Sequence, residues 1–266
     1  MILSLNGVLC EEDTARIDPR DRGFTLGDGV FETIAVRNGA APRLVAHLAR
    51  LRDGLQVIGL ALEQSDQDLV DRMNDVLAAN DTTNAVLRLT VSRGVGQRGI
   101  AVPATVSPTV VITANPLPPF PTPARVTIAA STCRNEKSPL SRIKSLGYLD
   151  NIVARREADA RGVDDAIMLN TRGDIACATV ANVFLLVDGG LITPRVEDGA
   201  LPGLARADVI TLARAEERTV SRDELNRASE MFLTNALGVR PVTHIDNAPV
   251  GDGEPGLITQ LLATRV

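Results

Sequence analysis

The sequence predicts a mixed α/β protein of two domains, and three observations lead to this prediction. The 266 residues exceed one typical domain, and 44% hydrophobic with 23% charged residues is the balance of an ordinary globular protein. Runs of β-branched residues alternate with segments whose apolar residues recur at helical spacing. A proline-rich stretch, residues 114–123, divides the chain. We expect one domain over residues 1–115, a linker over 116–124 and a second domain over 125–266.

The first domain reads as a small α/β unit. Residues 29–36 alternate in strand fashion, and apolar residues from Leu44 to Ile58 recur at helical spacing until Gly59 ends them. Residues 86–91 and 109–113 are β-branched runs suited to buried strands.

The proline-rich stretch from Ala114 to Pro123 reads as an extended connection. Its prolines remove backbone donors and fix φ, which argues against a helix or a central strand.

The second domain reads as a larger mixed unit. We predict a strand over 125–130, followed by an amphipathic helix that ends near Gly162 and has the apolar positions Leu146, Leu149, Ile152 and Val153. Strands over 166–170 and 182–187 bracket a turn at 171–174. A helix over 204–213 and a strand over 230–234 follow.

Composition excludes several classes of function. The net charge of -5 and the scattered Lys and Arg residues give no footprint for nucleic acid. No segment approaches the roughly 20 apolar residues that cross a bilayer, and the first residues lack a positive leader. Three widely spaced cysteines and two histidines offer no metal-ligand spacing. We therefore expect a cytoplasmic protein without a metal, a membrane segment or a nucleic-acid partner.

Lys144 lies among apolar residues just before the predicted helix. A lysine forced out of water has a lowered pKa, so its amine becomes a usable nucleophile and base. On spacing alone, most lysines in such a position are surface residues at a helix start.

Other segments also fit both a functional and a purely structural interpretation. The turn Pro202-Gly203 leads into a helix and could offer free backbone donors to a phosphate, but it also fits an ordinary helix start. The glycines within residues 21–33 fit a simple turn, and Arg50 fits a solvated helix position.

Taken together, these segments resemble the class IV (fold type IV) enzymes that use pyridoxal 5'-phosphate (PLP). That group holds D-amino-acid aminotransferases, branched-chain aminotransferases and aminodeoxychorismate lyase. The resemblance rests on the order and spacing of residues 21–33, 47–51, 141–146, 201–206 and 234–238, and it covers nearly the whole chain. It implies a small N-terminal α/β domain, a larger C-terminal barrel-like domain, PLP in the cleft between them, and a homodimer.

The resemblance also implies residue roles. Lys144 would hold PLP as a Schiff base and carry protons, and Arg50 would bind the cofactor phosphate. Backbone donors of four further residues would surround the same phosphate, namely Leu204, Ala205, Asn235 and Ala236.

One position departs from the family pattern. Members carry a glutamate five residues before the Asn of an Asn-Val-Phe strand, where it pairs with the pyridine nitrogen; here Cys177 stands five residues before Asn182. A carboxylate keeps the ring nitrogen protonated so that the ring can accept electrons. A neutral thiol does this poorly, whereas a thiolate beside a pyridinium partly replaces the carboxylate.

The substrate-binding positions are mixed. Branched-chain enzymes usually carry Asn-Tyr at the fourth and fifth positions after the lysine, where this chain has Tyr148 and Leu149. D-amino-acid enzymes hold the substrate carboxylate with Arg-x-His and a tyrosine. Arg98 matches that arginine, but Ile100 replaces the histidine and Phe31 the tyrosine.

Three functions follow from this pattern. The first is amino-group transfer between a D-amino acid or an aliphatic or branched-chain amino acid and a 2-oxo acid. The second is an aminodeoxychorismate lyase that releases pyruvate and 4-aminobenzoate, because the Arg-Gly-hydrophobic ending of the loop at Arg98 is closer to the lyase pattern. The third is a PLP-retaining protein with little catalysis.

Overall fold

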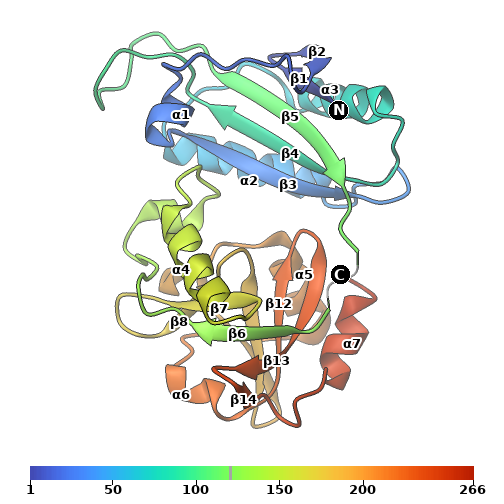
Figure 1. Ribbon diagram of the computed structural model, residues 1–266, viewed down its shortest axis with the longest axis vertical. Helices are drawn as coiled ribbons and strands as arrows, with labels where there is room; N and C mark the ends of the chain where they lie inside the picture. The colour runs from blue at the N-terminus through green and yellow to red at the C-terminus, as the bar shows by residue number, and fades with distance from the viewer. Residues whose placement is uncertain (120–121) are drawn as a thin grey trace. The chain divides into compact units, whose positions relative to one another are not determined.

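The computed structural model describes residues 1–119 and 122–266, which form two compact units. The first unit holds Met1–Pro118 and Ile143–Gly147, and the second holds Pro119–Arg142 and Tyr148–Val266. One unit contains a small antiparallel sheet and the other a larger, curled sheet (Figure 1). The predicted mixed α/β class is confirmed.

The first unit is an antiparallel sheet with the strand order β2-β1-β5-β4-β3. Its strands are β1 (Ile2–Leu5), β2 (Val8–Glu11), β3 (Gly29–Val36), β4 (Ala85–Ser92) and β5 (Thr109–Pro116), and its helices are α1 (Arg22–Leu26), α2 (Leu44–Val57) and α3 (Asp66–Ala79). Helices α2 and α3 cover one face of the sheet (Figure 1), and the core between them includes Ile34, Leu51 and Leu89.

Local sequence determines most of this unit. Strand β3 has the predicted bounds, and the residue after the C-cap of α2 is Gly59, whose φ of +60° ends the helix. The expectation that residues 114–116 lie outside a strand is wrong, because β5 continues to Pro116 opposite Ala85. The short β1 pairs with β5 only near Val111, so no strand on that side needs the missing donor of Pro116. Residues 120–121 of the predicted linker lie outside the described residues.

The segment Ile143–Gly147 pairs with the outer edge of β3. Ser145 forms an antiparallel bridge with Val30, and the backbone N–H of Phe31 donates to the carbonyl of Lys144 at 2.9 Å. The segment therefore groups with the first unit, although the predicted division assigned all of residues 125–266 to the second domain. The place of the linker as a domain boundary stays a prediction.

The second unit contains a nine-stranded sheet among the described residues, ordered β11-β10-β9-β12-β13-β6-β7-β8, with β14 beside β13. Its strands are β6 (Ala124–Ile128), β7 (Asp165–Leu169), β8 (Ile175–Ala178), β9 (Asn182–Val187), β10 (Gly190–Pro194), β11 (Glu216–Arg218), β12 (Ala228–Asn235), β13 (Gly238–Ile245) and β14 (Ala248–Pro249), and its helices are α4 (Leu149–Ala160), α5 (Leu204–Ala213), α6 (Arg222–Leu225) and α7 (Leu257–Ala263). Strand β8 ends the order yet contacts β9 and β10, so the sheet curls toward a barrel.

Helix α4 differs from its prediction. It begins at Leu149 rather than Leu146, which belongs to the segment on the β3 edge. Its predicted apolar face is exposed at Leu149 and Ile152, and the buried positions include Ala154 and Ala158. Small side chains let the helix approach β7 closely, so burial follows size here rather than hydrophobicity.

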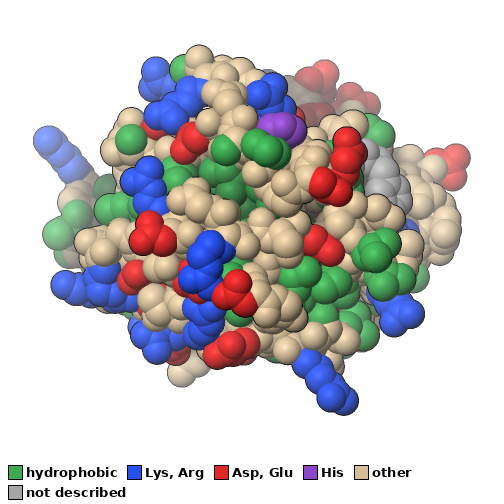
Figure 2. All heavy atoms as spheres, turned by 90° about the horizontal axis from the view of Figure 1, so that it is seen from below, with side chains coloured by type: hydrophobic (Ala, Val, Ile, Leu, Met, Phe, Trp, Pro, Cys, Tyr) green, Lys and Arg blue, Asp and Glu red, His purple; other side chains and the backbone are tan. Residues whose placement is uncertain are grey.

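The surface agrees with the scattered charge of the sequence. Basic and acidic side chains alternate over the face that Figure 2 shows. Among the described residues, no helix combines the length and apolar character that a membrane crossing requires.

Candidate active site

Lys144 is positioned by the backbone pairing of its segment with β3. Its Nζ lies 4.3 Å from the ring centroid of Phe31, a buried residue of that strand. The pKa of the lysine is lowered to about 8, mainly by burial; the charges of Arg50 and Arg88 act in the same direction, and that of Glu32 opposes them. At physiological pH most of the amine is still protonated, but its neutral fraction is far larger than that of an exposed lysine, which is the direction of the pKa change expected from the sequence.

Arg50 is fixed by a buried carboxylate. Its Nε and Nη2 donate to the two oxygens of Glu32 at 2.8 and 2.7 Å, and His47 Nδ1 donates to the same carboxylate at 2.7 Å. Burial alone raises the pKa of Glu32, but the hydrogen bonds from Arg50 and His47 outweigh it and the net pKa is lowered. Glu32 therefore stays ionised and holds one edge of the Arg50 guanidinium next to Lys144.

Two residues of this cluster, Glu32 and His47, were not predicted as site residues. Residues 47 and 50 are three apart on α2 and so share a helix face. That face meets the side of β3 on which Glu32 is buried between Val30 and Ile34. The signal in the sequence was a lone acid inside an apolar strand, which is rarely buried without a partner.

Arg88 is a further residue that sequence reasoning missed. Its guanidinium carbon lies 3.8 Å from the ring centroid of Phe31. Strand register explains this contact, because Arg88 pairs with Thr33, two residues from Phe31 on the same face of the sheet. A single sequence does not disclose that register.

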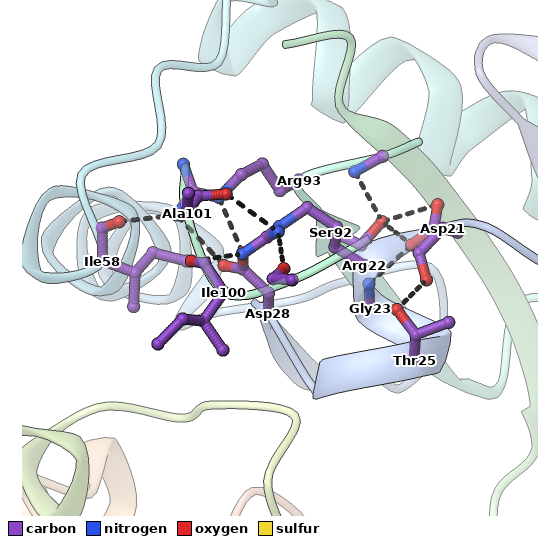
Figure 3. A network of polar contacts seen from close by, with 12 residues as sticks. Asp21, Arg22, Gly23, Thr25, Asp28, Ile58, Ser92, Arg93, Ile100 and Ala101 are labelled. Atoms are coloured by element: carbon purple, nitrogen blue, oxygen red, sulfur yellow. Dashed lines mark hydrogen bonds and ion pairs between the residues drawn. The ribbon is translucent and has the colours of Figure 1, made fainter. Parts of the chain in front are cut away.

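The loop that carries Arg98 is held by a network of buried charges (Figure 3). Arg22 donates to the carbonyls of Gly99, Ile100 and Ala101, at 3.0, 3.3 and 3.2 Å. Asp28 accepts from Arg22 and from Arg93, each at 2.8 Å. Arg98 itself is exposed on this loop.

Arg93 links the same network to the end of α2. Its Nη2 donates to the carbonyl of Ile58 at 2.7 Å and its Nη1 to that of Gly59 at 3.1 Å. Both Arg22 and Arg93 are buried and bound to Asp28, so neither is placed to receive a substrate.

The start of α5 in the second unit has the character of an anion site. Gly203 caps the helix without a side-chain hydrogen bond, and the first N–H groups of a helix have no partner within it. A Cβ at Gly203 would lie 2.0 Å from Asn182 Oδ1, so only glycine allows this approach. The ten-residue helix adds a positive dipole end at Leu204 and Ala205.

A second turn lies close to this helix start. Asn182 donates to the carbonyl of Leu201 at 2.8 Å and pairs across the sheet with Thr234. The next residue, Asn235, accepts the N–H of Leu237 at 2.8 Å and shapes the turn that contains Ala236. The hydroxyl of Thr234 is buried without a hydrogen-bond partner among the described residues.

Cys177 is buried in the second unit, in β8. It packs with small and apolar side chains, including Ala154 of α4 and Met168 of β7. Burial raises the pKa of its thiol to about 11, against a smaller opposing effect of Arg134. The thiol is neutral at physiological pH, which favours the first of the two states considered for it.

The structure thus brings three of the predicted residues together in the first unit, namely Lys144, Arg50 and Phe31. Arg98 is on an exposed loop of that unit. The remaining predicted residues belong to the second unit, namely Cys177, Leu204, Ala205, Asn235 and Ala236. Their roles stay predictions.

Comparison with known proteins decides the family. The sequence model of the amino-transferase class IV family matches residues 29–245, which include the Lys144 segment, α2 and the start of α5. The chain belongs to the class IV aminotransferases.

Similar proteins within the class IV family are named for different activities. The chain is 32% identical to a branched-chain-amino-acid aminotransferase of Methanocaldococcus jannaschii, with 100% of the chain and 95% of the relative covered. It is 30% identical to a D-alanine aminotransferase of Bacillus licheniformis, with 100% and 96% covered. It is 31% identical to an aminodeoxychorismate lyase of Bacillus subtilis, with 98% and 93% covered.

A solved structure of the class IV family supports the same fold. The branched-chain aminotransferase of Thermoproteus uzoniensis, crystallised with norvaline, superposes with a TM-score of 0.92 at 30% identity, over 100% of this chain and 93% of that one.

Class IV aminotransferases use PLP, and the residues of this chain fit it. A partly buried lysine with a pKa near 8 suits the aldehyde of the cofactor. The open helix start at Leu204 and the orphaned hydroxyl of Thr234 suit an anion such as its phosphate.

Proposed function

We propose that the protein transfers an amino group between a D-amino acid or an aliphatic or branched-chain amino acid and a 2-oxo acid. The observation that carries this proposal is Lys144, a lysine with a pKa of about 8, held over Phe31 beside Arg50. A neutral amine in that place can bind an aldehyde carbon and can then carry a proton.

Each proposed site residue has a defined role. Lys144 would bind the cofactor through Nζ. After the substrate amine displaces it, the same Nζ would accept the proton from the substrate Cα and later donate it to another atom of the substrate or cofactor. Arg50 binds the phosphate, with Glu32 and His47 fixing its orientation. The backbone donors of Leu204, Ala205, Asn235 and Ala236 bind the same phosphate. PLP, when bound, supplies the ring that accepts the electrons left on the substrate carbon.

Cys177 is proposed to face the pyridine nitrogen. A thiol with a pKa of about 11 is neutral and cannot hold that nitrogen protonated as a carboxylate does. The ring then stores electrons less well, which slows transfer more than elimination.

This property favours a second candidate, the loss of pyruvate from aminodeoxychorismate, because elimination needs a carbanion and a leaving group only. The loop sequence Arg98-Gly99-Ile100 supports the same alternative, and the 31% identity to a lyase lies between the 32% and 30% identities to the two aminotransferases.

Arg98 and Phe31 are proposed as substrate-binding residues. Arg98 would bind the substrate carboxylate with a charge-assisted contact. Phe31 would form an apolar wall beside Lys144, because its ring already lies against Nζ.

The proposed assembly is a homodimer in the cytoplasm. The first unit exposes large apolar side chains at Phe24, Ile100 and Val102, a pattern typical of interfaces. Three cysteines without a disulfide are usual in a reducing compartment.

Peptide mapping tests the central assignment. Lys137 and Lys144 are the only lysines in the sequence, so borohydride reduction of the PLP-loaded protein can label one of two residues. We expect the pyridoxyl group on Lys144, and full labelling in Lys137→Ala, which changes an exposed residue. A label on Lys137 or no label would contradict the assignment.

A substrate panel then separates the three functions. Half-reactions with D-alanine or L-leucine indicate aminotransferase activity. Pyruvate release from enzymatically made aminodeoxychorismate indicates the lyase. A labelled protein that is inactive on all three substrates indicates a PLP-retaining protein.

A further inference from the structure

Two cationic side chains contact the same aromatic ring next to the proposed reaction centre. The guanidinium carbon of Arg88 lies 3.8 Å from the centroid of Phe31, and Lys144 Nζ lies 4.3 Å from it. The two cationic groups are therefore no more than about 8 Å apart.

This upper limit is compatible with the dimensions of an α-amino acid. Standard bond lengths put the carboxylate carbon about 2.5 Å from the amine nitrogen. A charge-assisted hydrogen bond adds about 2.8 Å between the carboxylate oxygen and a guanidinium nitrogen. The amine nitrogen of such an amino acid and a guanidinium bound to its carboxylate are therefore closer together than this limit, so the contacts on Phe31 are compatible with an amino acid that replaces Lys144 Nζ and binds Arg88.

Strand geometry leaves Arg88 accessible to such a substrate. It is exposed on β4 although its neighbours Leu87 and Leu89 are buried, because those two side chains point into the core. The contact with Phe31 holds the guanidinium carbon of Arg88 over the ring, and a guanidinium carries five N–H donors that suit a carboxylate.

The surrounding charge also favours an anion. Lys144 is under the positive fields of Arg50 and Arg88 and the negative field of Glu32, whose carboxylate is already bound by Arg50 and His47. Cations therefore outnumber acids around the ring of Phe31.

We propose that Arg88 binds the α-carboxylate of the amino-acid substrate and so determines preference for α-amino acids over amines that lack a carboxylate. The inference rests on the proposed function, because it takes Lys144 as the reaction centre. Arg88 would contact the carboxylate from the ring of Phe31, in addition to the contact proposed above for Arg98.

Binding of an unreactive acid tests the proposal directly. Isovalerate has the carboxylate without the amine, and isovaleramide has nearly the same shape without the charge. Both are titrated into the PLP-loaded protein and their dissociation constants measured. Arg88→Leu keeps apolar packing on Phe31, and Arg88→Gln serves as a second variant that is polar but uncharged. Arg16→Leu is the control, because Arg16 is exposed in the same unit and contacts only carbonyls of its own loop.

We expect both Arg88 variants to weaken isovalerate binding by about tenfold to a hundredfold, the usual effect of losing a hydrogen bond between charged groups. Isovaleramide binding, the PLP absorbance and the Arg16→Leu variant should be unchanged. In turnover, the Michaelis constant for the amino acid should rise, while an analogue with methyl in place of the carboxylate reacts as before.

Each other outcome overturns the proposal. Unchanged isovalerate binding in either Arg88 variant, with PLP still on Lys144, would exclude Arg88 and leave the proposed function intact. Equal losses for isovalerate and isovaleramide would show a structural role. Absence of the Lys144 label in the wild-type protein would overturn the proposed function, and the inference with it.

Discussion

The amine of Lys144 makes folding depend on pH. Its pKa falls from 10.5 to about 8 on folding, so the unfolded chain binds the proton more tightly. Below about pH 8 both states are protonated and the cost of the buried charge is constant. Between about pH 8 and 10.5 the folded chain is deprotonated first, so the free energy of unfolding rises with pH.

Replacement of Lys144 should remove this dependence. Without PLP, Lys144→Met should have a higher melting temperature than the wild type at pH 7, and the difference should shrink from pH 8 to pH 10. Lys137→Met is the matched control and should track the wild type at every pH. A difference that grows with pH would show that the amine is not destabilised by burial.

The thiols should differ in reactivity. Cys177 is buried with a pKa of about 11, so only about one molecule in a thousand carries its thiolate at pH 8. Cys133 is exposed. Iodoacetamide at pH 8 should therefore alkylate Cys133 at least ten times faster than Cys177, as peptide masses over time would measure. Fast labelling of Cys177 in the native protein, but not of Cys133, would contradict a buried neutral thiol.

Residue roles were predictable from the sequence where one local pattern carries them. The apolar neighbours of Lys144 raised the hypothesis of a lowered pKa, but its role as the cofactor lysine came from the class IV resemblance. Glu32, His47 and Arg88 were not predicted, because their contacts depend on which helix face meets which strand and on the register of β3 with β4. Those pairings join residues that are far apart in the sequence.

Helix α2 and strand β3 are joined by the carboxylate of Glu32, whose side chain is 1% exposed. Glu32→Gln should lower the free energy of unfolding by about 3–5 kcal/mol, because it leaves Arg50 without its buried counter-charge. Urea denaturation would measure the change. Glu63→Gln, at an exposed position of the same unit, should have no effect. A decrease in the free energy of unfolding below about 1 kcal/mol would show that water screens the ion pair of Glu32 and Arg50.

The start of α5 should respond to a single methyl group. In Gly203→Ala the new Cβ would meet Asn182 Oδ1 at 2.0 Å, so the first turn must shift. We expect the dissociation constant for PLP to rise by about tenfold or more, with Lys144 still labelled by borohydride. Gly190→Ala is the control, since its Cβ would lie 3.6 Å from the nearest atom outside its neighbours. An unchanged dissociation constant for PLP would show that this helix start does not bind the cofactor phosphate.

Several elements were predicted within a residue or two of their observed bounds, and others were missed. Strand β3 and helices α2 and α5 match their predicted ranges within a residue or two. Helix α3 was missed although Ser65 and Asp68 form a capping box and Leu69, Met73 and Val76 recur at helical spacing, so the sequence held a signal that the prediction did not use. Short strands such as β1 hold only four residues, too few for alternation to be recognised.

At the scale of the whole molecule, composition and the class IV resemblance predicted the mixed α/β class and the two sheets. The curl of the larger sheet could not be derived from residue patterns. It results from the contact of β8 with β9 and β10, and therefore from tertiary pairing rather than propensity.

The pairing of Ile143–Gly147 with β3 also has a consequence for synthesis of the chain. Residues 1–118 leave the ribosome first, but the β3 edge is completed only by a segment that follows part of the second unit. Ile143, a residue of the core of the first unit, can join that core only after this segment has been synthesised. Such distant contacts slow folding, because a long loop must close before they form. The nascent first unit therefore exposes an unpaired strand edge, and Lys144 reaches its place only as that edge is closed.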